Sequence, residues 1–427
     1  MTHLFHWNAR ISIVFVLLAV LSVSLDCSAI PYARRAHASA ATASRPTGGR
    51  FVAHKGRTAS AGRSSIAGAR GRRSTVHGRT SRTGRRGLAV SLWTGRHETG
   101  ERFYANSFND NQTLGDATAG EDPIVRAAAI QALGNMNGTA LVIDPSSGRI
   151  LAMVNQKLAL SSGAEPCSTI KLSVALAALD EGLIKRDTMV NVGGHTKTNL
   201  TQALAHSINP YFETLGRMMG FERVKYYANQ FGLGELAGYN IPGEQLGVYP
   251  DTEISARLGG VGRMCSFGEG ISMTPLQLGA LVSAIANDGT LYYLQHPQTP
   301  DEIANFEPRV KRILDIAPLI PEMHDGLEGA VEYGTARSLR SSFHEFPVLG
   351  KTGTCSNDGT RFGWFASYAD TPTGRIVTVI FLEGGRPTFG PKAAELTGQF
   401  YRALWDHNYF APKTPQLASS YSADTRP

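Results

Sequence analysis

The stretch Pro166-Cys-Ser-Thr-Ile-Lys171 runs directly into the mostly apolar segment Leu172-Ser-Val-Ala-Leu-Ala-Ala-Leu-Asp-Glu-Gly182. Its composition and the glycine at its end predict a buried helix. Ser168 then lies in the first turn, where backbone N–H groups are free, and Lys171, three residues on, shares its face. A hydroxyl beside an amine whose pKa is lowered by burial can act as a nucleophile with its base. Taken alone, however, S-x-x-K is common by chance, and a first-turn serine beside a solvated lysine is its more frequent explanation.

Positive charge is concentrated near the N-terminus. Residues 31–90 hold 14 arginine and lysine residues and no aspartate or glutamate, whereas the net charge of all 427 residues is +7. The rest of the chain is therefore acidic. Residues 31–120 are predicted to be a disordered linker, because they are rich in Arg, Ser, Gly and Ala and poor in large apolar side chains. This linker is either a solvated spacer or a contact for anionic envelope polymers, and no nucleic-acid binding is expected because no aromatic residues are interleaved.

Residues 11–25 are apolar except for serines. The segment is shorter than the ~20 residues that span a bilayer, so it suits a signal peptide that is cleaved near residues 27–29. An uncleaved signal anchor over residues 1–30 is the competing interpretation. Either one predicts export to the cell envelope, with the protein periplasmic or membrane-anchored and facing the periplasm.

Residues 121–411 have a globular pattern and precede a polar tail at 412–427. Helices are expected over 122–133, 168–183, 201–206, 210–219, 221–231, 274–287, 321–333 and 392–407, and strands over 139–143, 149–154, 348–354, 362–368 and 376–382. Residues 232–262 are expected to form a loop and 266–270 a tight turn. A hairpin, several helices, three antiparallel strands and a final helix predict an α+β domain with one antiparallel sheet beside a helical lobe.

Two short motifs follow the first one in the chain, Ser207-x-Asn209 and Lys351-Thr352-Gly353. Each is weak alone, but chance would rarely produce all three in this order at these separations. They form the motif set of the penicillin-recognising serine acyltransferases. Further matches are Glu165-Pro166 before the serine and Ser266-Phe-Gly-Glu-Gly270. The segment from about 121 to 410 therefore resembles the transpeptidase domain of a penicillin-binding protein.

The resemblance implies a five-stranded antiparallel sheet flanked by helices, with an all-helical lobe. It also implies a serine D,D-transpeptidase that cross-links peptidoglycan stem peptides and is acylated by penicillin. Ser168 would attack the D-Ala-D-Ala bond, and Lys171 is the favoured proton acceptor. Lys351 would help keep Lys171 neutral through like-charge repulsion. Ser207 would relay the proton to the leaving amine, and Asn209 would hold Lys171 and a substrate amide.

The third motif and the residue after it are expected to bind the substrate. Thr352 and Thr354, two apart on a strand, point the same way and would bind the substrate carboxylate beside Gly353. Backbone N–H groups of Ser168 and Thr354 would form the oxyanion hole. This chemistry requires no cofactor and no metal, and the histidines show no pairing at zinc spacing.

Two features depart from the family. Cys167 and Cys355 flank motif residues, and position 167 is usually glycine. They are either small, buried, inert residues, or Cys167 forms a disulfide with Cys355 or with Cys265. In addition, class B members usually carry a long pedestal domain on the N-terminal side, where the predicted linker lies here. Partners that bind such a pedestal are therefore not carried over.

Three other functions remain open from the sequence. A D,D-carboxypeptidase would use water as the acceptor. A serine β-lactamase is less compatible, since Asn209 is not the valine of the class D enzymes and no deacylating glutamate motif of the class A kind is evident. A non-catalytic β-lactam-binding scaffold or sensor is disfavoured, because a scaffold gives no reason to retain Ser168, Lys171, Ser207, Asn209 and Lys351 together.

Overall fold

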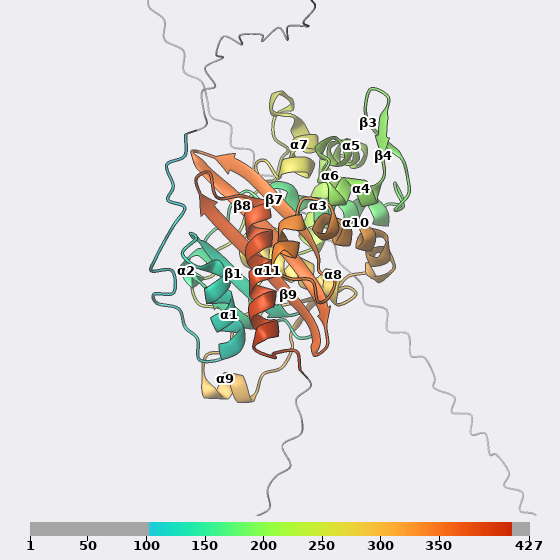
Figure 1. Cartoon of the computed structure of the whole chain (residues 1–427). Helices are drawn as coiled ribbons and strands as arrows, with labels where there is room; N and C mark the ends of the chain where they lie inside the picture. Colours follow the sequence, from blue (N-terminus) through green and yellow to red (C-terminus); the bar gives the residue numbers. More distant parts are fainter. Residues whose placement is uncertain (1–101, 412–427) are drawn as a thin grey trace, which may run out of the picture. The chain divides into compact units, whose positions relative to one another are not determined.

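The computed structural model describes residues 102–411 (Figure 1). The main sheet has five antiparallel strands in the order β2-β1-β9-β8-β7. Its strands are β1 (Gly138–Asp144), β2 (Arg149–Val154), β7 (Leu349–Asn357), β8 (Thr360–Thr371) and β9 (Gly374–Gly384). The early hairpin β1–β2 and the late trio β7–β9 join through β1 and β9, which confirms the predicted α+β fold. The predictions for residues 1–101 and 412–427, namely the signal segment, the basic linker and the polar tail, concern residues outside the described range.

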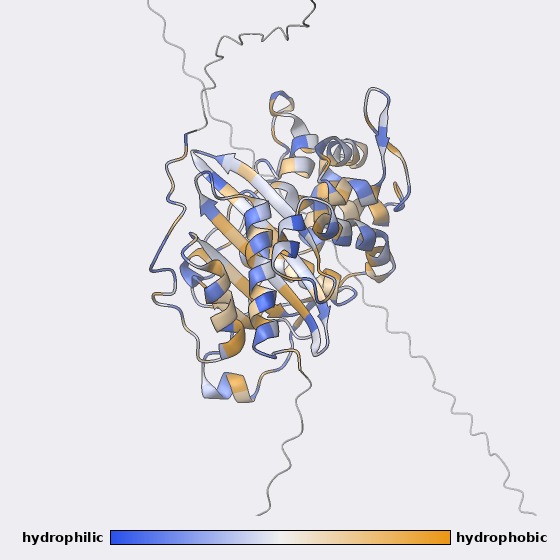
Figure 2. Cartoon of the chain, viewed as in Figure 1, coloured by the Kyte–Doolittle hydropathy of each residue, from blue (hydrophilic) through white to orange (hydrophobic). Residues whose placement is uncertain are grey.

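Helices α1 (Pro123–Leu133) and α11 (Gly390–Asp406) cover one face of the sheet (Figure 1). The Asp122 side chain accepts hydrogen bonds from the first N–H groups of α1, as its sequence predicts. Successive side chains of β1 point to opposite faces of the sheet, so this strand contributes to two cores. Ala140 and Val142 lie in the core under α1 and α11, while Leu141 and Ile143 lie in the opposite core. Figure 2 shows polar residues on the outward side of α11, as expected for an amphipathic surface helix.

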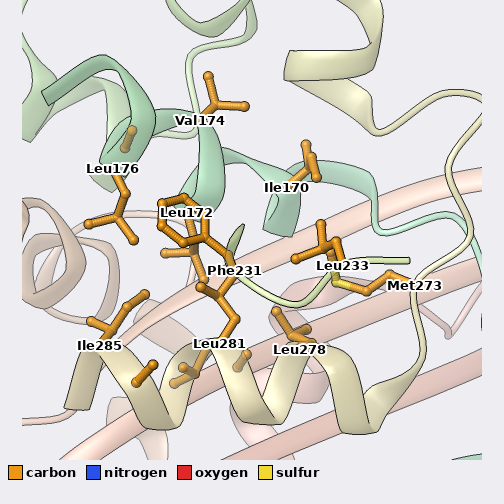
Figure 3. Close-up of a cluster of buried hydrophobic side chains, with 14 of the residues drawn as sticks. Ile170, Leu172, Val174, Leu176, Phe231, Leu233, Met273, Leu278, Leu281 and Ile285 are labelled. Carbon is orange, nitrogen blue, oxygen red and sulfur yellow. The ribbon is translucent and has the colours of Figure 1, made fainter. Parts of the chain in front are cut away.

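Helices α8 (Pro275–Ala286) and α3 (Lys171–Asp180) lie on the other face. Thr274 and Gln277 form a reciprocal capping box at the start of α8, and the whole helix is buried. Figure 3 shows side chains of α3, such as Leu172, directed toward Leu281 and Ile285 of α8, with Phe231 between the two helices. The helix that follows the nucleophile candidate is therefore anchored in the core.

The helical lobe contains α4 (Leu200–Ala205), α5 (Asn209–Met219), α6 (Phe221–Gln230), α7 (Gly260–Phe267) and α10 (Ile320–Glu332). The smaller elements are α2 (Gln156–Ala159), α9 (Pro300–Ala304) and the hairpins β3–β4 (Val190–Gly193 and Thr196–Thr198) and β5–β6 (Thr290–Tyr292 and Val310–Ile313). These two hairpins were not predicted. Across residues 102–411, no helix is long and apolar enough to cross a membrane.

Helix α7 replaces the end of the expected loop and the start of the expected tight turn, whereas residues 232–259 contain no α-helix or strand and the chain does turn at 268–270. Residues 260–267 are helical, and the chain turns only at Gly268, whose φ is 75°. Glycines on both helices allow α7 to pack closely on α5, because a Cβ on Gly262 of α7 would lie 3.4 Å from the Glu213 carbonyl and one on Gly216 of α5 would lie 2.5 Å from the Cys265 sulfur. Tertiary packing thus overrides the low helix propensity of this stretch.

Residues 102–120 differ from the expectation of a disordered linker up to residue 120. The Asp116 carboxylate accepts hydrogen bonds from the N–H groups of Asn155 (3.1 Å) and Gln156 (2.8 Å), and it pairs with Arg126 at 2.8 Å. Its side chain is almost completely buried. One buried, fully paired carboxylate therefore ties this polar stretch to β2 and α1, a contact that composition alone does not reveal.

Candidate active site

Ser168 lies in a short 3₁₀ turn, Cys167–Ile170, that leads into α3. The sequence predicted the first turn of an α-helix, and the tighter turn is stabilised locally by Thr169, whose N–H and hydroxyl both donate to the Pro166 carbonyl at 3.1 and 2.6 Å. Gly182, with φ at 65°, follows the end of α3 as predicted. The turn presents Ser168 at the surface of the core while Lys171 begins the buried helix.

Lys171 is completely buried and lies at the centre of the cluster. Its Nζ is 2.8 Å from Ser168 Oγ, 2.9 Å from Ser207 Oγ, 3.0 Å from the Ser207 carbonyl and 2.5 Å from Asn209 Oδ1. The first and second motifs therefore meet on one amine. Since they come from separate helices, the tertiary structure and not the local sequence brings them together.

Ser207 lies between the two lysines. Lys351, also completely buried, donates from Nζ to Ser207 Oγ at 2.9 Å and to the Thr352 carbonyl at 3.0 Å. Ser207 has a φ of 55°, in the left-handed region that non-glycine residues rarely adopt. This backbone conformation, between α4 and α5, lets both its hydroxyl and its carbonyl reach Lys171.

Both lysines have lowered pKa values. Burial lowers the pKa of Lys171 well below its usual range, and the nearby Lys351 charge lowers it further. Burial alone lowers the pKa of Lys351 to about 7. Among residues 102–411, no carboxylate lies within salt-bridge distance of either amine. The charge of Glu213 opposes the shift at Lys171, but burial outweighs it, so the environment of Lys171 favours its neutral form.

The three residues expected to bind the substrate lie on β7, the edge strand of the sheet. Thr352 Oγ1 is 2.7 Å from Thr335 Oγ1, and Thr354 Oγ1 accepts a hydrogen bond from the Gly390 N–H at 2.8 Å. A Cβ on Gly353 would lie 2.9 Å from the Pro166 carbonyl. Only glycine therefore lets β7 come this close to the turn Cys167–Ile170 that carries the candidate nucleophile, which is called the nucleophile turn below.

Sequence reasoning missed Thr335 and Gly390 as neighbours of the Lys-Thr-Gly strand. No pattern around Thr335 indicates this contact, and the proline at 391 marks a helix start without indicating what lies beside it. Across residues 102–411, no cluster of His, Cys, Asp or Glu is arranged to hold a metal ion.

A disulfide joins Cys167 to Cys355, with their Cα atoms 5.4 Å apart. This confirms one of the two pairings that the sequence left open and shows that these residues are not inert thiols. Cys265 is a free, buried thiol, and burial raises its pKa. The bond connects the nucleophile turn to β7 across 188 residues of sequence.

A hollow of about 430 Å³ is lined by residues that include Glu165, Ser272, Phe362 and Glu383, and its lining contains neither Ser168 nor either buried lysine. Burial raises the pKa of Glu165 to about 7, and the nearby Glu269 raises it further while Arg263 opposes the shift. The Glu165 carbonyl accepts a hydrogen bond from Trp364 Nε1 at 3.0 Å, which holds the turn against β8.

Residues 138–402 match the family model described as the penicillin binding protein transpeptidase domain. The chain is 27% identical over 335 residues to the Stage V sporulation protein D of Bacillus subtilis, covering 66% of this chain and 51% of that protein. It is 24% identical over 347 residues to the peptidoglycan D,D-transpeptidase MrdA of Acinetobacter baumannii, covering 64% and 51%. The chain thus spans about half the length of these curated relatives.

Two solved structures share the fold. A structure from Burkholderia ambifaria, described as a peptidoglycan glycosyltransferase, aligns with a TM-score of 0.58 at 21% identity and covers 70% of this chain and 100% of that one. The D,D-transpeptidase domain of a peptidoglycan glycosyltransferase from Eggerthella lenta aligns with a TM-score of 0.54 at 20% identity, covering 70% and 87%. At these identities, the likeness describes the fold alone.

Proposed function

Because the chain belongs to the penicillin-binding protein transpeptidase domain family, we propose that it is a serine D,D-transpeptidase that cross-links D-Ala-D-Ala stem peptides of peptidoglycan through an acyl-enzyme and is acylated by β-lactams. The observation that carries this proposal is the 2.8 Å contact between Ser168 Oγ and the buried amine of Lys171. A hydroxyl at hydrogen-bond distance from a neutral amine is an activated nucleophile. Relatives such as MrdA are named peptidoglycan D,D-transpeptidases.

The hydrogen bonds around Lys171 favour its role as the base. A neutral amine has two N–H donors and one lone pair. The Ser207 carbonyl and Asn209 Oδ1 can only accept, so they take the two N–H groups. The lone pair is then left for a hydroxyl hydrogen, and the hydroxyls of Ser168 at 2.8 Å and Ser207 at 2.9 Å both lie within reach of it. As Ser168 Oγ attacks the carbonyl carbon of the scissile bond, its proton passes to Lys171.

Ser207 connects this proton to the leaving group. Its hydroxyl is 2.9 Å from each lysine nitrogen, so it can pass the proton from Lys171 to the nitrogen of the departing D-alanine. The Lys351 charge favours this direction, because it makes a second ammonium at Lys171 unfavourable. In the second half of the reaction, an acceptor amine gives its proton to the same pair and attacks the ester.

The edge of β7 supplies the remaining groups. Backbone N–H groups of Ser168 and Thr354 would stabilise the oxyanion, and losing one such donor typically costs ~2.7–4 kcal/mol. The Thr352 and Thr354 hydroxyls, together with the charge of Lys351, suit the terminal carboxylate of the substrate, and Gly353 keeps the strand close to the nucleophile. Asn209 would hold a substrate amide with the nitrogen that faces away from Lys171.

Labelling with a fluorescent penicillin tests the proposal. The wild type should form a stable covalent adduct and Ser168→Ala none. A D-Ala-D-Ala peptide, with and without an added amine acceptor, then separates the outcomes. Transfer to the amine supports the transpeptidase, hydrolysis alone indicates a carboxypeptidase, and decay of the adduct within seconds indicates a β-lactamase. Lack of any adduct on folded wild type indicates a non-catalytic domain and overturns the proposal.

We also propose that the domain works in the cell envelope, on the outer side of the membrane. Support comes from the apolar segment at residues 11–25 and from relatives whose names place them in peptidoglycan synthesis. The basic segment at residues 31–90 would contact anionic envelope polymers. Fractionation of cells that produce a tagged protein tests the location, and recovery in the cytoplasmic fraction would contradict it.

A further inference from the structure

The Cys167–Cys355 disulfide flanks both groups that the proposed function assigns to the oxyanion hole. Cys167 directly precedes Ser168, and Cys355 directly follows Thr354. The covalent bond therefore joins two segments at positions one residue away from each N–H donor. The separation and relative orientation of those two donors depend on how the nucleophile turn sits against the end of β7.

Non-covalent contacts also join the nucleophile turn to the sheet. The Trp364 indole donates to the Glu165 carbonyl at 3.0 Å, and the surface of Gly353 lies against Pro166 and Thr169. The backbone conformation of Cys167 is unfavourable, because its φ of 52° lies in the left-handed region that glycine adopts readily and cysteine does not. The local preference of residue 167 thus opposes the observed turn, and the bond to Cys355 holds it in place.

We propose that the Cys167–Cys355 disulfide is a positioning element that keeps the two oxyanion donors aligned, so that the oxidised protein is acylated faster than the reduced protein. The inference rests on the proposed function and deepens it. Neither sulfur touches the reacting atoms in this scheme. The pair acts through the backbone of Ser168 and Thr354, and the oxidising conditions of the envelope would favour the active form.

The two sulfurs differ in access, which defines how reduction would proceed. Cys167 is completely buried, whereas Cys355 is partly exposed. A dithiol such as dithiothreitol would attack the Cys355 sulfur as a thiolate, break the S–S bond and form a mixed disulfide. Its second thiol then closes the reagent into a cyclic disulfide. The protein gains two electrons and two protons, and both cysteines become thiols.

The test uses the full chain with Cys27→Ala and Cys265→Ala, which leaves Cys167 and Cys355 as its two cysteines. Thiol titration under denaturant should find no thiols before reduction and two after it. Acylation by fluorescent penicillin is measured as a function of penicillin concentration, well below the melting temperature of each form. This separates the maximal acylation rate from the non-covalent dissociation constant. Unreduced wild type is the matched control.

Reduction is expected to lower the maximal acylation rate about tenfold, less than the 10²–10³ lost when an oxyanion donor is removed altogether. The dissociation constant should change less than threefold. Hydrolysis of the adduct, which needs the same donors, should slow in parallel. A bond that only stabilises the fold would lower the melting temperature and leave both rates unchanged, and that result would overturn the inference.

Two variants keep the test decisive if the reduced protein unfolds. Cys167→Ala/Cys355→Ala removes the bond and leaves a left-handed alanine, whereas Cys167→Gly/Cys355→Ala removes it with a residue that accepts this φ. The glycine variant should recover part of the lost acylation rate. Equal rates in both variants and the wild type, or a faster rate without the bond, would overturn the inference alone. Absence of an adduct in every form would overturn the proposed function and this inference with it.

Discussion

The two faces of the sheet bury similar apolar side chains but differ in what else they bury. Under α1 and α11, the core consists of residues such as Val142, Phe365 and Phe400. Under α3 and α8, an apolar core surrounds Lys171 and Lys351, the two charged residues that are fully buried within residues 102–411. One face can be packed for stability alone, whereas the other holds two amines away from water and from carboxylates.

This difference accounts for the lowered pKa values of the two lysines in the candidate site. Burial disfavours the ammonium form of Lys171 more than the charge of Glu213 favours it, so the pKa of this amine lies well below its usual range. The price is a less favourable core at that face, in keeping with the general conflict between stability and active-site chemistry. Substitutions on the two faces should therefore have opposite signatures in rate and in stability.

Replacing the base gives the largest expected effect. Lys171→Met keeps the length and much of the volume of the side chain but removes the proton acceptor for Ser168. Acylation by penicillin should slow by about 10²–10⁴, the usual contribution of a positioned base. Circular dichroism should still show a folded protein. Acylation within tenfold of wild type would contradict the role of Lys171.

The opposite face should respond in the opposite way. Phe400 is 1% exposed and packs in the core under α11. Phe400→Ala should lower the free energy of unfolding by about 3–5 kcal/mol, because it removes buried area and leaves a cavity. Urea denaturation measures this loss. Below its own transition, the variant should acylate at the wild-type rate, and a large loss of rate there would mean that the two faces are not independent.

The sequence predicted the stable face more completely than the reactive one. Asp122 and Pro123 mark the start of α1, and alternation marks β1, because these signals depend on neighbours in the chain. Helix α7 was missed because glycines near its start are typical of a loop. The helix is stabilised by packing against α5, where Gly216 lies close to Cys265, and this contact is not visible in the local sequence.

The site itself could be assembled only in part. The spacing of Ser168 and Lys171 is a local pattern that a helical turn brings to one face. No local pattern shows that Ser207 and Lys351 meet on the same hydroxyl, so that expectation came from the family resemblance. The contact of Thr335 with Thr352 and the choice of Cys355 as the partner of Cys167 depend on long-range packing, which a single sequence does not encode in any short motif.

The like-charge contact between the lysines predicts a change in pH dependence. Acylation should rise with pH as Lys171 loses its proton. Lys351→Met removes the repulsion that helps to lower the Lys171 pKa, so this acid limb should move to higher pH, while burial still keeps the pKa below its usual range. Stopped-flow measurement of the acylation rate between pH 5 and 9 locates the pH at which this rate rises.

Thr335→Val is the matched control for that experiment. It removes the hydrogen bond to Thr352 in the same cleft without changing any charge. Its acylation rate can fall, but its acid limb should stay at the wild-type pH. If both variants shift the limb equally, general damage to the cleft explains the change better than electrostatic coupling between Lys351 and Lys171.

The smallest expected effect comes from Glu165, a carboxyl group at the border between the reactive core and the solvent. Burial, with repulsion from Glu269, raises its pKa in the folded state to about 7. A carboxyl whose folded pKa lies above its unfolded value contributes stability that is present below pH ~4.5 and is lost as pH rises through about 7. Glu165→Gln should therefore lose less stability than the wild type over this interval. Because the carboxyl is partly exposed, solvent screening keeps the difference small.

Denaturation at pH 4.5 and 8 measures this difference in stability, with Glu222→Gln as the same change at an exposed position of α6. An identical pH dependence in Glu165→Gln and the wild type would mean that the Glu165 side chain ionises as if it were in water, and that the hollow it lines is polar enough to solvate a charge.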